Sequence, residues 1–114
     1  MDVIIWHNPR CSKSRETLAM LEDEGHEVEE RRYLDDMPTK NEIRDVLDKL
    51  GKKPFELIRK GEALFKELNL ADADEDALLI AMVEHPRLIE RPIVLADDKA
   101  ALGRPPEAVL SILD

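Results

Sequence analysis

The stretch VIIWHNPRCSKSR, residues 3–15, decides how the chain begins to fold. Its first four residues, Val3–Trp6, are β-branched or aromatic, and such a run predicts a short buried strand. Pro9 cannot lie in the interior of a helix, so we expect the strand to give way to a loop at that point. From Ser14 the pattern becomes helical. This order places Cys11, the only cysteine of the chain, in a loop between a strand and a helix.

The middle of the chain carries the clearest helical pattern. Thr39 and Glu42 have the spacing of a capping box, apolar residues follow at helical intervals, and Gly51 is placed to end the helix. The other expected elements are a helix from Ser14 to a C-cap at Gly25, a strand over 27–33, helices over 62–68 and 74–85, strands over 93–95 and 100–102 joined by a turn at 97–98, and a last helix opened by Pro105 and Pro106.

The order of these elements indicates the fold class. A β-α-β unit comes first, a block of helices follows, and a β-β-α unit ends the chain. This is the order of an α/β, thioredoxin-like domain in which helices near residues 39–88 form an insertion. A chain of 114 residues has the size of one domain, so residues 1–114 are expected to form a single one. A fold by itself implies no activity, so the site has to be argued from its residues.

Composition excludes several classes of protein. The formal net charge of −9 makes the surface repel nucleic acid and anionic membranes, so neither is expected as a partner. Hydrophobic residues make up 43% of the chain, but no apolar stretch approaches the roughly 20 residues of a membrane span. The acidic start and the short apolar run behind it do not resemble a signal peptide. A single cysteine cannot form an internal disulfide, and a cytoplasmic protein is therefore expected.

Cys11 stands where a thiol is easily activated. Backbone N–H groups at a helix start favour an anion, and Arg10, Lys13 and Arg15 add positive charge in the same loop. Such surroundings lower the pKa of a cysteine from about 8.5 to roughly 3.5–7.5. A lone cysteine is more often a small buried residue, but this cationic loop favours a reactive thiol that also binds oxyanions. His7 either tunes the thiol or has a structural role, and spacing alone does not separate the two.

The sequence CSKS, residues 11–14, lacks the second cysteine of a dithiol oxidoreductase. Ser14 occupies that position, where it is expected to be a cap or helix-surface residue that can donate a hydrogen bond to the sulfur. A covalent adduct on Cys11 therefore has to be resolved by a thiol from another molecule. One cysteine and three scattered histidines show no ligand spacing, so no metal site is expected.

Four motifs follow one another along the chain: HNPRCSKSR at 7–15, LIRKG at 57–61, HPRLIERPIV at 85–94 and GRPPE at 103–107. In this order they resemble the glutaredoxin-linked arsenate reductase family, whose members have a thioredoxin-like fold with a helical insertion. The resemblance runs from Ile4 to Leu113. It therefore implies the same fold class as the order of the predicted elements.

The resemblance also implies an activity, the thiol-dependent reduction of arsenate to arsenite. Cys11 would be the nucleophile, and His7 would favour its thiolate. Arg59, Arg91 and Arg104 would hold the oxyanion. Glutathione would be the co-substrate and glutaredoxin the protein partner, with no bound cofactor, which fits the missing second cysteine.

Elementary chemistry supports the arginines independently. Planar, bidentate guanidinium groups suit a tetrahedral oxyanion. Arg91 and Arg104 each precede a proline and are therefore expected in extended or turn backbone. In thioredoxin-like folds a cis-proline faces the active-site loop, and Pro92 is the candidate here. Taken singly, arginines in an acidic chain are mostly surface ion-pair residues, and from the residues alone Arg59 has the weakest support.

Two other functions remain open from the sequence. A related family with the same fold binds RNA polymerase and regulates transcription without catalysis. Its members typically carry a two-cysteine switch where this chain has CSKS, and they do not usually carry all three arginines. The other alternative is a glutathione-dependent thiol-transfer protein, which would keep the chemistry of Cys11 and change the substrate.

Overall fold

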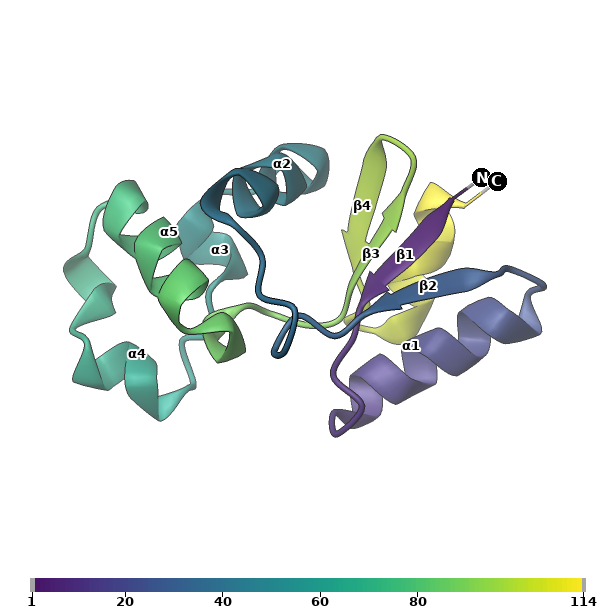
Figure 1. The fold of residues 1–114 in the computed structure, drawn as a ribbon, viewed down its shortest axis with the longest axis horizontal. Coiled ribbons are helices and arrows are strands. Elements are labelled where there is room, and N and C mark those ends of the chain that lie inside the picture. The colour runs from purple at the N-terminus through teal and green to yellow at the C-terminus, as the bar shows by residue number, and fades with distance from the viewer. Residues whose placement is uncertain (1, 114) are drawn as a thin grey trace. The chain divides into compact units, whose positions relative to one another are not determined.

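The computed structural model describes residues 2–113, which form two compact units (Figure 1). The first unit contains the chain up to Asp36 and again from Arg91 onward, and the second contains Met37–Glu90. Within the described residues, no helix combines the length and the apolar character needed to cross a membrane.

The first unit is built on a four-stranded sheet with the order β2-β1-β3-β4. The strands are β1 (Val3–Trp6), β2 (Val28–Arg31), β3 (Ile93–Ala96) and β4 (Lys99–Leu102). β1 and β2 are parallel, whereas β3 is antiparallel to both β1 and β4. One end of the sheet therefore contains the C-terminal ends of β1 and β2 together with the start of β3. Figure 1 shows β1 between β2 and β3, which agrees with its nearly continuous apolar sequence.

One face of this sheet is covered by α1 (Ser12–Asp23) and by a 3-10 helix, η3 (Pro106–Ile112). Side chains alternate along a strand, so every second residue of β1 points to the helices. The buried cluster on this face consists of Val3, Ile5, Leu21, Val94 and Val109. Burying a side chain of this size contributes roughly 1.5–3 kcal/mol relative to exposure. This packing attaches α1 to the sheet and thereby positions the loop that precedes it.

The second unit is helical. Its elements are α2 (Lys40–Leu50), α3 (Pro54–Leu57), α4 (Ala63–Glu67), η1 (Leu70–Asp72), α5 (Glu75–Glu84) and η2 (Pro86–Leu88). α5 contacts α2, α3 and η2. The predicted capping box of α2 is confirmed, because the Glu42 N–H donates to Thr39 Oγ1 at 3.2 Å and the Thr39 N–H donates to Glu42 Oε1 at 3.0 Å. Gly51 ends this helix in the left-handed conformation, with φ 67°.

Several predicted boundaries move by a few residues for local reasons. α1 begins at Ser12 rather than Ser14, because the Cys11 N–H closes the loop by donating to the Asn8 carbonyl at 3.0 Å. The second strand ends at Arg31 rather than near Leu34, because the chain turns there and the Asp36 N–H donates to the Arg32 carbonyl at 2.8 Å.

Other departures concern short helices. The last helix is a 3-10 helix, stabilised by bonds such as that from the Ala108 N–H to the Pro105 carbonyl at 3.0 Å. α3, η1 and η2 are absent from the sequence prediction, because segments of three or four residues carry no periodic pattern. The peptide bond before Pro92 is cis, as expected, and the bond before Pro105 is also cis.

Candidate active site

The loop between β1 and α1 is held by its own backbone. The His7 N–H donates to the Arg31 carbonyl at 2.7 Å, which extends the pairing of β1 with β2 into the loop. The Cys11 N–H donates to the Asn8 carbonyl at 3.0 Å. These bonds place Cys11 at the N-cap of α1, with the extended backbone that an N-cap residue requires.

The environment of Cys11 favours the thiolate. Burial raises the pKa of the thiol, since the side chain is only 9% exposed. The Ser14 backbone N–H, the positive charge of Arg91 and the Lys13 backbone N–H lower the pKa by more than burial raises it. The net result is a pKa below the ordinary value of a cysteine, in the predicted direction. The two amides act at a helix start without forming a conventional capping hydrogen bond.

The side-chain charge that acts on this thiol comes from Arg91. The sequence predicted that Arg10, Lys13 and Arg15 would supply this charge, and the structure corrects that prediction. The Lys13 ammonium pairs with Glu16 at 3.8 Å, and the Arg15 guanidinium donates to a loop carbonyl at 2.9 Å. Arg10 is exposed. Only the pairing of β1 with β3 brings the charge of Arg91 to the sulfur.

Arg91 offers hydrogen-bond donors that nothing in the described chain accepts. Its Nε and Nη1 atoms are buried and have no hydrogen-bond partner among residues 2–113. Buried polar groups almost always have partners, and leaving a donor unpaired costs about 1–3 kcal/mol, more when it is charged. Two unpaired, positively charged donors near a thiol of lowered pKa are therefore well suited to bind an anion from solution.

Arg104 is attached to the same segment. Its Nε donates to the Arg91 carbonyl at 2.7 Å, and the Gly103 N–H donates to the Pro92 carbonyl at 2.9 Å. A Cβ on Gly103 would lie 2.6 Å from Thr17 Oγ1 and 2.7 Å from Pro92 Cγ, so this close approach requires glycine. Gly103 was not predicted as a structural requirement of the site, and its only signal in the sequence is its place ahead of Arg-Pro-Pro.

His7 is connected to Cys11 through Ser14. His7 Nδ1 lies 2.6 Å from Ser14 Oγ, which also accepts the Asn8 N–H at 3.1 Å, and both side chains are buried. Burial lowers the pKa of His7, and the neighbouring carboxylate of Glu30 offsets only part of that effect. The ring is therefore neutral near pH 7. The Ser14 hydroxyl is hydrogen-bonded to His7 and to the Asn8 N–H, so His7 stabilises the first turn of α1. The Ser14 backbone amide in that turn favours the Cys11 thiolate.

Arg59 belongs to the second unit, where two carboxylates surround its guanidinium. Its Nη1 lies 3.0 Å from Glu62 Oε2, and its Nε lies 3.4 Å from Glu90 Oε1. Its backbone N–H donates to the Leu88 carbonyl at 2.6 Å. Of the predicted site residues, the first unit therefore brings together Cys11, His7, Arg91 and Arg104, and Arg59 is held by ion pairs of the second unit.

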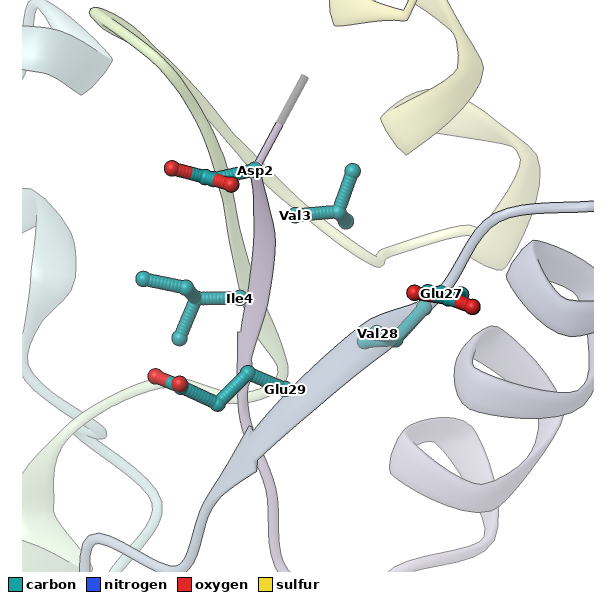
Figure 2. Close-up of a pocket in the computed structure, with 6 residues that line it drawn as sticks. All are labelled: Asp2, Val3, Ile4, Glu27, Val28 and Glu29. Carbon is teal, nitrogen blue, oxygen red and sulfur yellow. The ribbon is translucent and has the colours of Figure 1, made fainter.

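A hollow of about 470 Å³ at the other end of β1 and β2 has the wrong charge for an anion (Figure 2). Its acidic residues are Asp2, Glu27 and Glu29. Figure 2 shows Asp2, Ile4 and Glu29 extending to the same side of the strand pair. An oxyanion would be repelled there, so this hollow is unsuited to bind one. Among residues 2–113 there is also no group of three or more His, Cys, Asp and Glu residues that could hold a metal ion.

Comparison with known proteins assigns the family. The family model described as the ArsC family matches residues 6–112. The chain belongs to the ArsC family. This ArsC-family protein is 54% identical to the uncharacterized protein YfgD of Escherichia coli (strain K12), over 97% of this chain and 96% of that protein. It is 48% identical to an arsenate reductase of Haemophilus influenzae, over 99% of this chain and all of the relative (100%).

A solved structure gives the same result for the fold. The arsenate reductase from Vibrio cholerae matches the ArsC-family protein with a TM-score of 0.96 and 49% identity, over 99% of this chain and 98% of that chain. The α/β, thioredoxin-like fold class and the family resemblance predicted from the sequence are thereby confirmed.

Proposed function

We propose that this ArsC-family protein reduces arsenate to arsenite, with Cys11 as the nucleophile, glutathione as the reductant and glutaredoxin as the partner that regenerates the thiol. The observation that carries the proposal is the pair of buried, unpartnered Arg91 nitrogens beside a thiol whose pKa is lowered. An oxyanion whose central atom accepts a thiolate satisfies both groups at once. Relatives named arsenate reductase in Haemophilus influenzae and Vibrio cholerae support arsenate as that oxyanion.

The first step forms a bond between sulfur and arsenic. The Cys11 thiolate attacks the arsenic of bound arsenate, one As–O bond breaks, and the departing oxygen takes up protons and leaves as water. Negative charge on the remaining oxygens increases as the bond forms. The N–H donors of Arg91 and the start of α1 stabilise that charge, which is the usual way in which fixed donors accelerate such a step.

The second and third steps use outside thiols, because the chain has no other cysteine. The thiolate of glutathione attacks the Cys11 sulfur, a disulfide forms, and the electron pair of the S–As bond stays on arsenic. As(V) thereby becomes As(III), which takes up protons and leaves as arsenite. A glutaredoxin thiolate then attacks the glutathione sulfur of the mixed disulfide, and the Cys11 thiolate leaves. The scheme uses no bound cofactor and suits the reducing cytoplasm.

The three arginines are expected to contribute unequally. Arg91 has two donors without a partner among residues 2–113 and acts on the thiol, so its contribution should be the largest. Arg104 binds the Arg91 carbonyl through Nε, which leaves the rest of its guanidinium for the oxyanion. Arg59 is partly neutralised by Glu62 and Glu90, and these carboxylates compete with any anion.

Arsenite production by the purified protein tests the proposal. Arsenate is supplied with glutathione and glutaredoxin, together and separately, and arsenite is measured. Dependence on both thiols is expected, and a glutathione adduct of Cys11 should accumulate when glutaredoxin is withheld. Arsenite production without any added thiol would contradict the mechanism. Transfer of glutathione without arsenite production would favour the thiol-transfer alternative, and no reaction of either kind would favour the regulator.

A further inference from the structure

A hollow of about 390 Å³ lies beside the Cys11 loop. One wall is the loop itself, residues 7–10, and the other is the segment that follows β2, with Arg32, Leu34 and Asp35. The volume falls in the range of about 300–1,000 Å³ that is typical of small-molecule sites. Arg10, the last loop residue in the wall, directly precedes Cys11, so the lining of the hollow ends one residue before the nucleophile.

The strand order places this hollow and Arg91 on opposite sides of β1. β2 and β3 flank β1 on opposite sides, and the ends of β1 and β2 meet the start of β3 at one edge. The hollow therefore lies on the β2 side of the Cys11 loop, whereas Arg91 leads into β3. A ligand in the hollow and an oxyanion at Arg91 would approach Cys11 from different sides.

The charges in the hollow match a zwitterionic peptide. Arg10 and Arg32 supply two guanidinium groups, and Asp35 supplies one carboxylate. The carboxylate paired with Arg32 is distant, since Arg32 Nη2 lies 4.0 Å from Glu30 Oε1. Leu34 adds an apolar surface that is 39% exposed. Glutathione carries the complementary set, namely two carboxylates, one ammonium group and a thiol in its middle residue.

We propose that this hollow binds glutathione, with the peptide carboxylates at Arg10 and Arg32 and the ammonium group at Asp35. The inference rests on the proposed function, because it takes glutathione as the reductant. An extended peptide of three residues spans about 10 Å, and neighbouring Cα atoms lie about 3.8 Å apart, so a peptide held at Arg10 can reach the sulfur of the next residue. The reductant then attacks from the β2 side while arsenate is held from the β3 side.

The test compares two disulfides that react with Cys11. The Cys11 thiolate attacks glutathione disulfide, a Cys11–glutathione disulfide forms, and one glutathione thiolate leaves. Bis(2-hydroxyethyl) disulfide undergoes the same exchange but carries no charges. The ratio of the two rate constants, measured by mass spectrometry, isolates recognition of the charged peptide from the reactivity of the thiol, because a change in thiol pKa affects both reactions.

The variants are Arg10→Ala, Arg32→Ala, the double variant and Asp35→Asn. Arg44→Ala is the matched control, because it removes the same charge from an exposed position on α2, in the second unit. In each single arginine variant the ratio should fall about fivefold, the effect of roughly 1 kcal/mol, and it should fall further in the double variant. Asp35→Asn should lower the ratio as well, and Arg44→Ala should leave it unchanged.

An unchanged ratio in both single arginine variants would overturn the proposal. An equal fall in Arg44→Ala would also overturn it, because the effect would then come from net charge alone. The outcome is independent of arsenate. If the ratio responds as expected but wild-type protein makes no arsenite, the proposed function fails and the glutathione site stands. If arsenite forms and the ratio does not respond, the site fails and the function stands.

Discussion

Replacing Arg91 by alanine should abolish most of the activity while leaving the fold intact. The variant loses two buried donors, Nε and Nη1, that have no partner in the described chain. Since those donors already bear the cost of burial without a hydrogen bond, their removal relieves a penalty of about 1–3 kcal/mol, which offsets the lost packing of the side chain. We therefore expect the free energy of unfolding to change by less than about 1 kcal/mol.

The expected effect on catalysis is much larger. Removing one donor to a developing oxyanion typically lowers kcat by about 10²–10³-fold. We expect kcat/KM for arsenate to fall at least about 10²-fold, or roughly 2.7 kcal/mol of transition-state stabilisation. Lysine at Arg91 keeps the charge but loses the planar fork, so Arg91→Lys should recover only part of the loss. Arg59→Ala should cost less, because Glu62 and Glu90 already neutralise Arg59.

The assay is arsenate reduction from neutral pH to about pH 9, above the ordinary cysteine pKa. The loss of Arg91 should also raise the pKa of Cys11. If Arg91 acted only by favouring the thiolate, the activity of Arg91→Ala would approach that of the wild type at a pH where the alkylation rate shows its Cys11 to be ionised. A deficit that persists once the thiol is ionised indicates contact with the oxyanion. Arg44→Ala is the control, whereas Arg87 is unsuitable because its Nε lies 3.9 Å from Glu62, a partner of Arg59. Wild-type activity in a folded Arg91→Ala protein would refute the reasoning.

Three further predictions concern the thiol, the packing and the buried histidine. The rate of Cys11 alkylation should show a midpoint below about 8.5, because the helix-start amides and Arg91 outweigh burial, and a midpoint at or above that value would contradict this. Gly103→Ala should lower the free energy of unfolding by about 1–3 kcal/mol, since its Cβ would meet Thr17 Oγ1 at 2.6 Å, whereas Gly61→Ala, with open space around it, should not. Burial holds the pKa of His7 below 6.5, so protonation of His7 favours the unfolded chain. The free energy of unfolding, measured in urea, should therefore fall as the pH drops through 6.5, and His7→Asn should flatten that dependence.

Features that depend on neighbouring residues could be predicted from the sequence. The strand at Val3–Trp6 is confirmed at its predicted bounds, because its side chains favour a buried strand whatever surrounds them. The same is true of the capping box at Thr39 and of the left-handed cap at Gly51, which are made within one turn of helix. The position of Cys11 at a helix start also follows from local order, because Pro9 ends one element shortly before the next begins.

Features that depend on distant residues required the tertiary structure. Which cation acts on the Cys11 thiol is decided by the pairing of β1 with β3, and that pairing selects Arg91 over the cations beside Cys11 in the sequence. The unpartnered donors of Arg91 and the contact of Gly103 with Thr17 are likewise properties of packing. Local sequence determines where a helix or strand forms, because capping and side-chain preference act over a few residues. The tertiary structure determines which charges lie close together in a buried site, because strands that are far apart in the chain must first pair. Burial then makes the interaction between those charges strong.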